Sequence, residues 1–118
     1  QRSFLLMYQL RKNDKALRVG LGFAFGHLVI FLVFLLATGF ALGGESRLLW
    51  ALWIPIDFPV SMLVGLGFDH IPTSNAAFQV LRTWWPLLVH GFFGTAWWFI
   101  APFLLVRLVE RRNNPKSK

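Results

Sequence analysis

The sequence has no cysteine and few charged residues. Because cysteine is absent, disulfides, thiolate metal ligands and cysteine nucleophiles are excluded. Charged residues make up 14% of the chain, against about 25% in soluble domains. Hydrophobic residues make up 56% and aromatic residues 17%. A soluble domain under about 150 residues leaves roughly a third of its unfolded-chain surface exposed. The composition therefore excludes an ordinary soluble enzyme and a disordered chain, and indicates an integral membrane protein.

The net charge of +7 is concentrated toward the two ends of the chain. Ten of the 12 basic residues precede the first long apolar run or follow the last one, and only Arg47 and Arg82 lie between them. Basic residues that flank apolar spans anchor a chain at anionic lipid headgroups. A nucleic-acid-binding protein needs a large basic face, which this pattern lacks. We therefore expect the lipid bilayer as a partner and no nucleic acid.

Three long apolar runs predict an all-α membrane protein built as a small bundle. Each run has about the 20 residues that a helix needs to cross a bilayer core. We expect a basic, partly amphipathic N-terminal segment, a membrane domain with three helices, and a basic C-terminal tail. The expected segments are 1–18, 19–106 with helices at about 19–42, 48–68 and 84–106, and 107–118. Gly43 and Gly44 are expected to end the first helix, and Thr73 or Ser74 to cap a short helix over 76–81.

The second apolar run carries two prolines, Pro55 and Pro59, on either side of Asp57. Each proline removes a backbone donor and clashes with the preceding turn. Backbone groups that lose their partners inside a bilayer must find others within the protein. The second helix is therefore expected to be kinked or broken, and it could be re-entrant.

The distribution of charge and the length of the second run favour different topologies. Three crossings would place six Lys and Arg residues on each side of the membrane, which gives no preferred orientation. A re-entrant second run would place ten on one side and two on the other, which is a strong bias. A 21-residue apolar run is normally a crossing. We expect three crossings, with two crossings and a re-entrant element as the alternative.

Asp57, His27 and His90 are candidates for a buried polar site. At 1.5 Å per residue, all three can lie near the middle of the membrane. A carboxylate at that depth costs at least about 2.5–3.5 kcal/mol and needs compensation. We expect Asp57 to accept backbone N–H groups at the proline break, and each histidine to bond a neighbouring helix. The alternatives are a proton or cation site, and a haem or chlorophyll-type pigment at His27 or His90. No metal site and no catalytic group is predicted.

Small residues spaced four apart predict close helix packing, within the bundle or against another chain. These residues are Gly22 and Gly26, Ala37 and Ala41, Gly39 and Gly43, and Gly91 and Thr95. Tryptophans are enriched at membrane interfaces, and we expect Trp50, Trp53, Trp84 and Trp85 there. Trp97 and Trp98 lie too deep for that belt and are expected in the core.

Together these features predict a non-catalytic multi-pass protein with very little mass outside the bilayer. We expect an accessory or assembly subunit that packs against larger membrane proteins or associates with itself, in a bacterial inner membrane. One alternative is a minimal proton, ion or small-solute transport unit centred on Asp57 with His27 and His90. Another is a haem- or pigment-binding subunit of an electron-transfer or light-harvesting complex.

Overall fold

The computed structural model describes residues 2–41 and 44–113 and is all-helical within them. Two stretches, Asp14–Thr38 and Ala76–Asn113, are long and apolar enough to cross a membrane. The helical elements in chain order are α1 (Arg2–Thr38), η1 (Gly39–Ala41), η2 (Gly44–Leu52), α2 (Trp53–Ile56), α3 (Met62–His70), α4 (Ala76–Leu88), η3 (Val89–Gly94) and α5 (Thr95–Asn113).

Helix α1 joins the basic N-terminal segment and the first apolar run into one element. It ends at Thr38, earlier than expected, and Gly39 follows with a φ of 58°. Glycine adopts this left-handed conformation at low cost, so it ends the helix here. Phe40 shares the left-handed conformation with a φ of 66°. The expected glycine turn at Gly43 lies outside the described residues.

Helices α4, η3 and α5 follow one another without a break. The cap of α4 is Asn75, whose side chain accepts a hydrogen bond from the N–H of Phe78 at 3.0 Å, and neither Thr73 nor Ser74 takes this role. Pro86 lies inside α4, and the next turn, η3, is a π-helix. The expected short helix over 76–81 and the third apolar run are therefore parts of one long rod.

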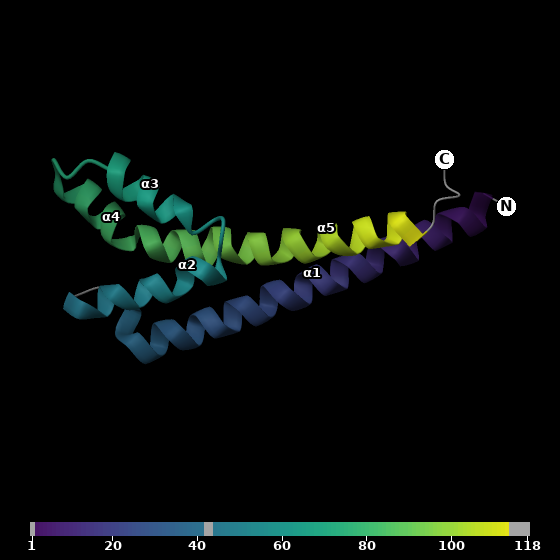
Figure 1. The fold of residues 1–118 in the computed structure, drawn as a ribbon, viewed down its shortest axis with the longest axis horizontal. Coiled ribbons are helices and arrows are strands. Elements are labelled where there is room, and N and C mark those ends of the chain that lie inside the picture. The colour runs from purple at the N-terminus through teal and green to yellow at the C-terminus, as the bar shows by residue number, and fades with distance from the viewer. Residues whose placement is uncertain (1, 42–43, 114–118) are drawn as a thin grey trace.

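The expected helix over 48–68 is divided into η2, α2 and α3. Residues 57–61 form a turn between α2 and α3, because Pro59 has no N–H with which to continue the helix. In Figure 1, η2 and α2 run toward the middle of the molecule and α3 returns from it. The chain thus makes a hairpin, and does not run straight through from Leu48 to Phe68.

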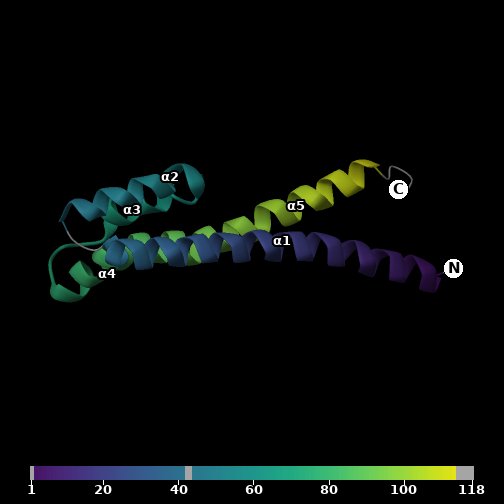
Figure 2. The same cartoon turned by 90° about the horizontal axis from the view of Figure 1, so that it is seen from below.

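The hairpin covers only one half of the pair formed by the two long helices. Helices α1 and α5 pack against each other and run in opposite directions, and both chain ends lie at the same end of the molecule (Figure 1). In Figure 2 the hairpin lies over the half of the pair that is farther from the chain ends. The buried apolar core lies where the hairpin meets the long helices. It is formed by Phe31, Leu35, Trp50 and Trp53, with Phe34 and Leu87 packed against them.

Candidate functional site

The carboxylate of Asp57 lies at the tip of the hairpin and is fully buried. Its Oδ1 is 2.8 Å from Nε2 of His27 on α1 and accepts from Nε1 of Trp98 on α5 at 3.1 Å. Its Oδ2 is 2.7 Å from Nδ1 of His90 on η3. The structure thus brings all three predicted polar residues together, from three separate segments of the chain. We call Asp57, His27, His90, Trp98 and Thr95 the polar cluster.

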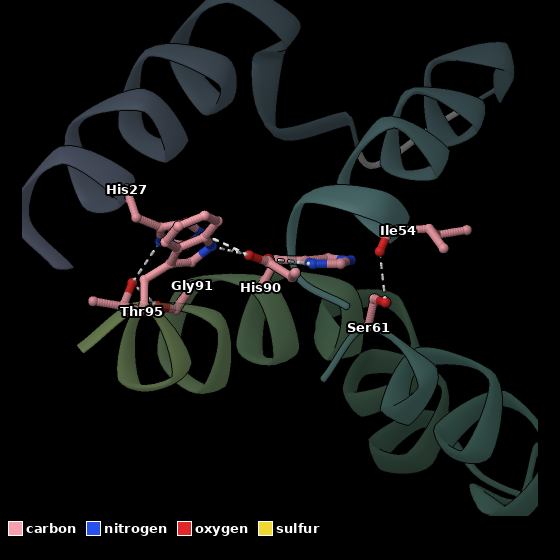
Figure 3. Close-up of polar contacts among 8 residues, drawn as sticks. His27, Ile54, Ser61, His90, Gly91 and Thr95 are labelled. Carbon is pink, nitrogen blue, oxygen red and sulfur yellow. Dashed lines mark hydrogen bonds and ion pairs between the residues drawn. The ribbon is translucent and has the colours of Figure 1, made fainter. Parts of the chain in front are cut away.

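The turn at the hairpin tip fixes the position of Asp57 through its backbone. The N–H of Asp57 donates to the carbonyl of Trp53 at 2.9 Å, and its own carbonyl accepts from the N–H of Ser61 at 3.0 Å. The hydroxyl of Ser61 donates to the carbonyl of Ile54 at 2.8 Å (Figure 3). These bonds give partners to backbone groups near the proline break, where the regular helical hydrogen bonds stop. The carboxylate itself takes side-chain donors, not the backbone N–H groups expected at such a break.

His27 uses both ring nitrogens within the chain. Its Nδ1 lies 3.0 Å from Oγ1 of Thr95, and that hydroxyl donates to the carbonyl of Gly91 at 2.6 Å (Figure 3). A threonine hydroxyl has one proton to donate, so Oγ1 is left as an acceptor for His27. When Asp57 is ionised, the donors and acceptors balance with a proton on each ring nitrogen of His27. The positive imidazolium then neutralises the buried carboxylate, as a low-dielectric site requires.

His90 uses only one of its ring nitrogens. Its ring is 0% exposed and stacks on Trp50, with centroids 5.7 Å apart and planes 10° apart. Its Nδ1 faces Asp57, whereas its Nε2 is buried and has no hydrogen-bond partner in the described part of the chain. An ionised carboxylate only accepts, so Nδ1 carries a proton. A proton on Nε2 would be an unpaired buried donor, so the hydrogen bonding favours a lone pair on that atom.

Two glycines in η3 make room for side chains of the other segments, Gly94 for Asp57 and Gly91 for Phe31. A Cβ placed at Gly94 would lie 2.6 Å from Oδ2 of Asp57, and one at Gly91 would lie 2.9 Å from Cε1 of Phe31. Any larger residue at Gly94 would push the carboxylate out of its position. Gly91 was expected at a packing interface, whereas no role was expected for Gly94 or Ser61 and no π-helical turn was predicted.

The other small residues expected at helix interfaces have a different environment. A Cβ at Gly22, Gly26 or Gly39 would meet nothing within 4 Å. Ala37 is exposed. The side chain of Ala41 and all of Gly43 lie outside the described residues. Gly22, Gly26 and Gly39 therefore make no close helix contact within the described residues.

Two of the four tryptophans expected at a membrane interface are buried in the core. Trp50 and Trp53 are 8% and 2% exposed and pack around the two histidines, so they belong to the core and not to an interfacial belt. Trp84 is 42% exposed. Trp85 is half-buried and donates its N–H to the carbonyl of Leu63 at 2.8 Å. Trp98 lies deep within α5, and its N–H has the buried carboxylate of Asp57 as its acceptor.

A large apolar groove adjoins the cluster on the side of the chain ends. It has a volume of about 1160 Å³ and is bounded by α1, α5 and the hairpin tip. Gly22 and Gly26 line it on α1, Ala101 and Leu105 on α5, and Phe58 at the hairpin tip. The open space found at the two glycines is therefore the interior of this groove.

A haem or a chlorophyll-type pigment would need a free and accessible ring nitrogen on His27 or His90. His27 has no free ring nitrogen to offer a haem iron or a pigment magnesium. His90 has a free Nε2, but its ring is enclosed and covered by Trp50. Among the described residues, no group of three or more His, Cys, Asp or Glu side chains is placed to hold a metal ion.

Comparisons with known proteins give no relative from which a role could be transferred. The chain matches no protein-family model, and no curated protein and no solved structure is significantly similar to it.

Proposed function

We propose that this chain is a small accessory or assembly subunit embedded in a membrane, with no reaction of its own. It crosses the bilayer twice, through α1 and through the rod of α4, η3 and α5, and inserts the hairpin between these crossings from one side. This topology places ten of the 12 basic residues on the side of the chain ends. By the positive-inside rule that side is cytoplasmic, and a bacterial inner membrane is the proposed location.

The observation that supports this proposal is the internal bonding of the polar cluster. Asp57 is bonded to His27, His90 and Trp98, and His27 is bonded to Thr95. The hydrogen bonds of these residues join the hairpin to both crossings. A polar network specifies one arrangement of helices when its members are satisfied, and among the polar side-chain atoms of this cluster all but Nε2 of His90 have a partner. The cluster thus fixes the hairpin against both crossings, and the apolar surface of the subunit keeps one arrangement that a partner can bind.

The surface of the subunit offers an interface to a neighbouring membrane protein or to a second copy. On the side of α1 that faces away from α5, Phe25, Val29, Leu32 and Leu36 are all exposed. Their spacing of four, three and four residues places them on one face of the helix. This face is continuous over more than two turns and is free of charge.

The test is the size of the complex that the chain forms at native abundance. After gentle detergent extraction, we expect a discrete assembly on native gels, with a stoichiometric partner or with further copies of the chain. Replacing Leu36 by Asn should weaken that assembly, whereas replacing Ile54 by Asn at an exposed hairpin position should not. A monodisperse monomer from the wild type would refute the proposal.

A second candidate function, proton transfer through the membrane, is favoured by His90. Its buried Nε2 is an unused proton acceptor beside an acid–base pair, and groups of this kind recur in proton relays. Proteoliposomes loaded with a pH-sensitive dye distinguish the two functions. Under the accessory role the protein adds no flux to that of empty vesicles. Under the transport role flux appears and is lost in Asp57→Asn.

A further inference from the structure

We propose that the apolar groove binds a phospholipid with an anionic headgroup, taken from the leaflet on the side of the chain ends. The proposal adds a ligand site to the chain, and it rests on the membrane topology proposed above. The groove is defined by its lining on α1, α5 and the hairpin tip, including Gly22, Gly26, Phe58, Ala101 and Leu105.

The depth of the groove fits one leaflet. Arg18 and His27 are nine residues apart on α1, which is about 13 Å along a helix. Half of a hydrocarbon core is about 15 Å. The hairpin tip closes the inner end of the groove near the middle of the membrane, and its arms occupy the other half (Figure 2). A partner helix that crosses the whole bilayer would meet the hairpin, whereas an acyl chain from one leaflet ends where the groove ends.

The inner end of the groove suits a hydrocarbon chain and not a polar head. His27, Trp53 and Trp98 line it. Both nitrogens of His27 and the N–H of Trp98 already bond the polar cluster. A polar headgroup placed there would therefore lose its hydration without gaining these donors. The volume of about 1160 Å³ also exceeds the roughly 300–1,000 Å³ of common small-molecule sites, as an elongated lipid chain requires.

Basic side chains lie beyond the outer end of the groove, outside its lining. Arg18 lies one helical turn before Gly22 and two turns before Gly26, so it continues the face that lines the groove. Its side chain is 78% exposed and pairs with Asp14 at 2.8 Å, and such exposed pairs are weak. Arg112 lies seven residues beyond Leu105 on the same face of α5. These cations mark the headgroup level and favour a negative phosphate there.

The test is to count the lipids that stay bound to the purified chain. The protein is reconstituted with phosphatidylglycerol or phosphatidylcholine, extracted in mild detergent and measured by native mass spectrometry. We expect one phosphatidylglycerol retained per chain. Gly26→Leu places a bulky side chain in the groove, since Gly26 lines it and nothing lies within 4 Å of a Cβ built there, and it should remove at least nine-tenths of that lipid. Gly65→Leu is the matched control, because Gly65 also has open space and lies outside the groove.

The headgroup is tested separately through Arg18→Gln. One basic residue near an anionic surface contributes about 1 kcal/mol, or about fivefold in affinity. The preference for phosphatidylglycerol over phosphatidylcholine should therefore fall about fivefold. Retention of lipid by Gly26→Leu, equal retention of both lipids by the wild type, or a polypeptide in the groove would overturn the proposal. The size of the complex on native gels reports on the accessory role independently, so the two proposals can fail separately.

Discussion

Replacing Asp57 by Asn should move a proton on His90 as well as destabilise the fold. Oδ1 of Asp57 serves two donors, His27 and Trp98, and Oδ2 serves one, His90. An asparagine has a single acceptor oxygen and an amide group that only donates. The oxygen is best placed toward His27 and Trp98, which leaves the amide facing Nδ1 of His90. His90 must then accept at Nδ1 and carry its proton on Nε2.

The cost of this change follows from the surroundings of Nε2. That atom is buried and has no partner in the described chain. As a lone pair it is an unused acceptor, but as an N–H it becomes an unpaired buried donor. An unpaired buried group costs about 1–3 kcal/mol. Asp57→Asn also removes the negative charge that pairs with the His27 imidazolium, and this loss adds to the cost. We therefore expect Asp57→Asn to lower the free energy of unfolding by at least about 1–3 kcal/mol.

Two measurements check this prediction. Unfolding in detergent micelles, followed by tryptophan fluorescence, gives the change in stability. Nitrogen-15 NMR of the histidines gives the tautomer of His90. Asp69→Asn is the matched control, because Asp69 is exposed on α3, and it should change stability by less than about 0.5 kcal/mol. An Asp57→Asn variant that unfolds like the wild type, with the proton of His90 still on Nδ1, would refute the reasoning.

Further predictions concern the space around the cluster and the charge within it. Gly94→Ala places a Cβ 2.6 Å from the Asp57 carboxylate and should cost about 1–3 kcal/mol, as overpacking does. Gly65→Ala has nothing within 4 Å and should stabilise its helix by about 0.5–1 kcal/mol; equal effects of the two changes would contradict the packing. The hydrogen-bond balance around Asp57 places a proton on each ring nitrogen of His27, and nitrogen-15 spectra of the wild-type protein should show both protons. A ring nitrogen of His27 without a proton would contradict this balance.

The sequence predicted the class of the protein because that class depends on composition and on the length of the apolar runs. A helical chain with helices long enough to cross a membrane follows from one-dimensional quantities. The hairpin could not be resolved in the same way. Pro55 and Pro59 indicated a break, but the direction of the chain after it depends on packing against α1 and α5. The length of the run and the distribution of basic charge favoured different answers.

For the polar site too, the sequence predicted the residues but not their partners. Asp57, His27 and His90 could be selected because ionisable groups are costly within apolar runs. Their partners could not, since the bonds of Asp57 to His27 and His90 span 30 and 33 residues. Trp98 was expected only as a core residue, although its depth called for an N–H acceptor. Gly22 and Gly26 carried the spacing of a helix interface, yet open space lies beside them.

The most direct test of the architecture is the side of the membrane on which the two ends of the hairpin lie. The chain has no native cysteine, so single cysteines at Glu45, Thr73 and Asn113, all exposed, can be labelled one at a time with an impermeant maleimide. The account predicts that Glu45→Cys and Thr73→Cys react from the same side, and that Asn113→Cys reacts from the opposite side. Reaction of Glu45→Cys and Thr73→Cys from opposite sides would mean that the second apolar run crosses the membrane, and would contradict the re-entrant hairpin that carries Asp57.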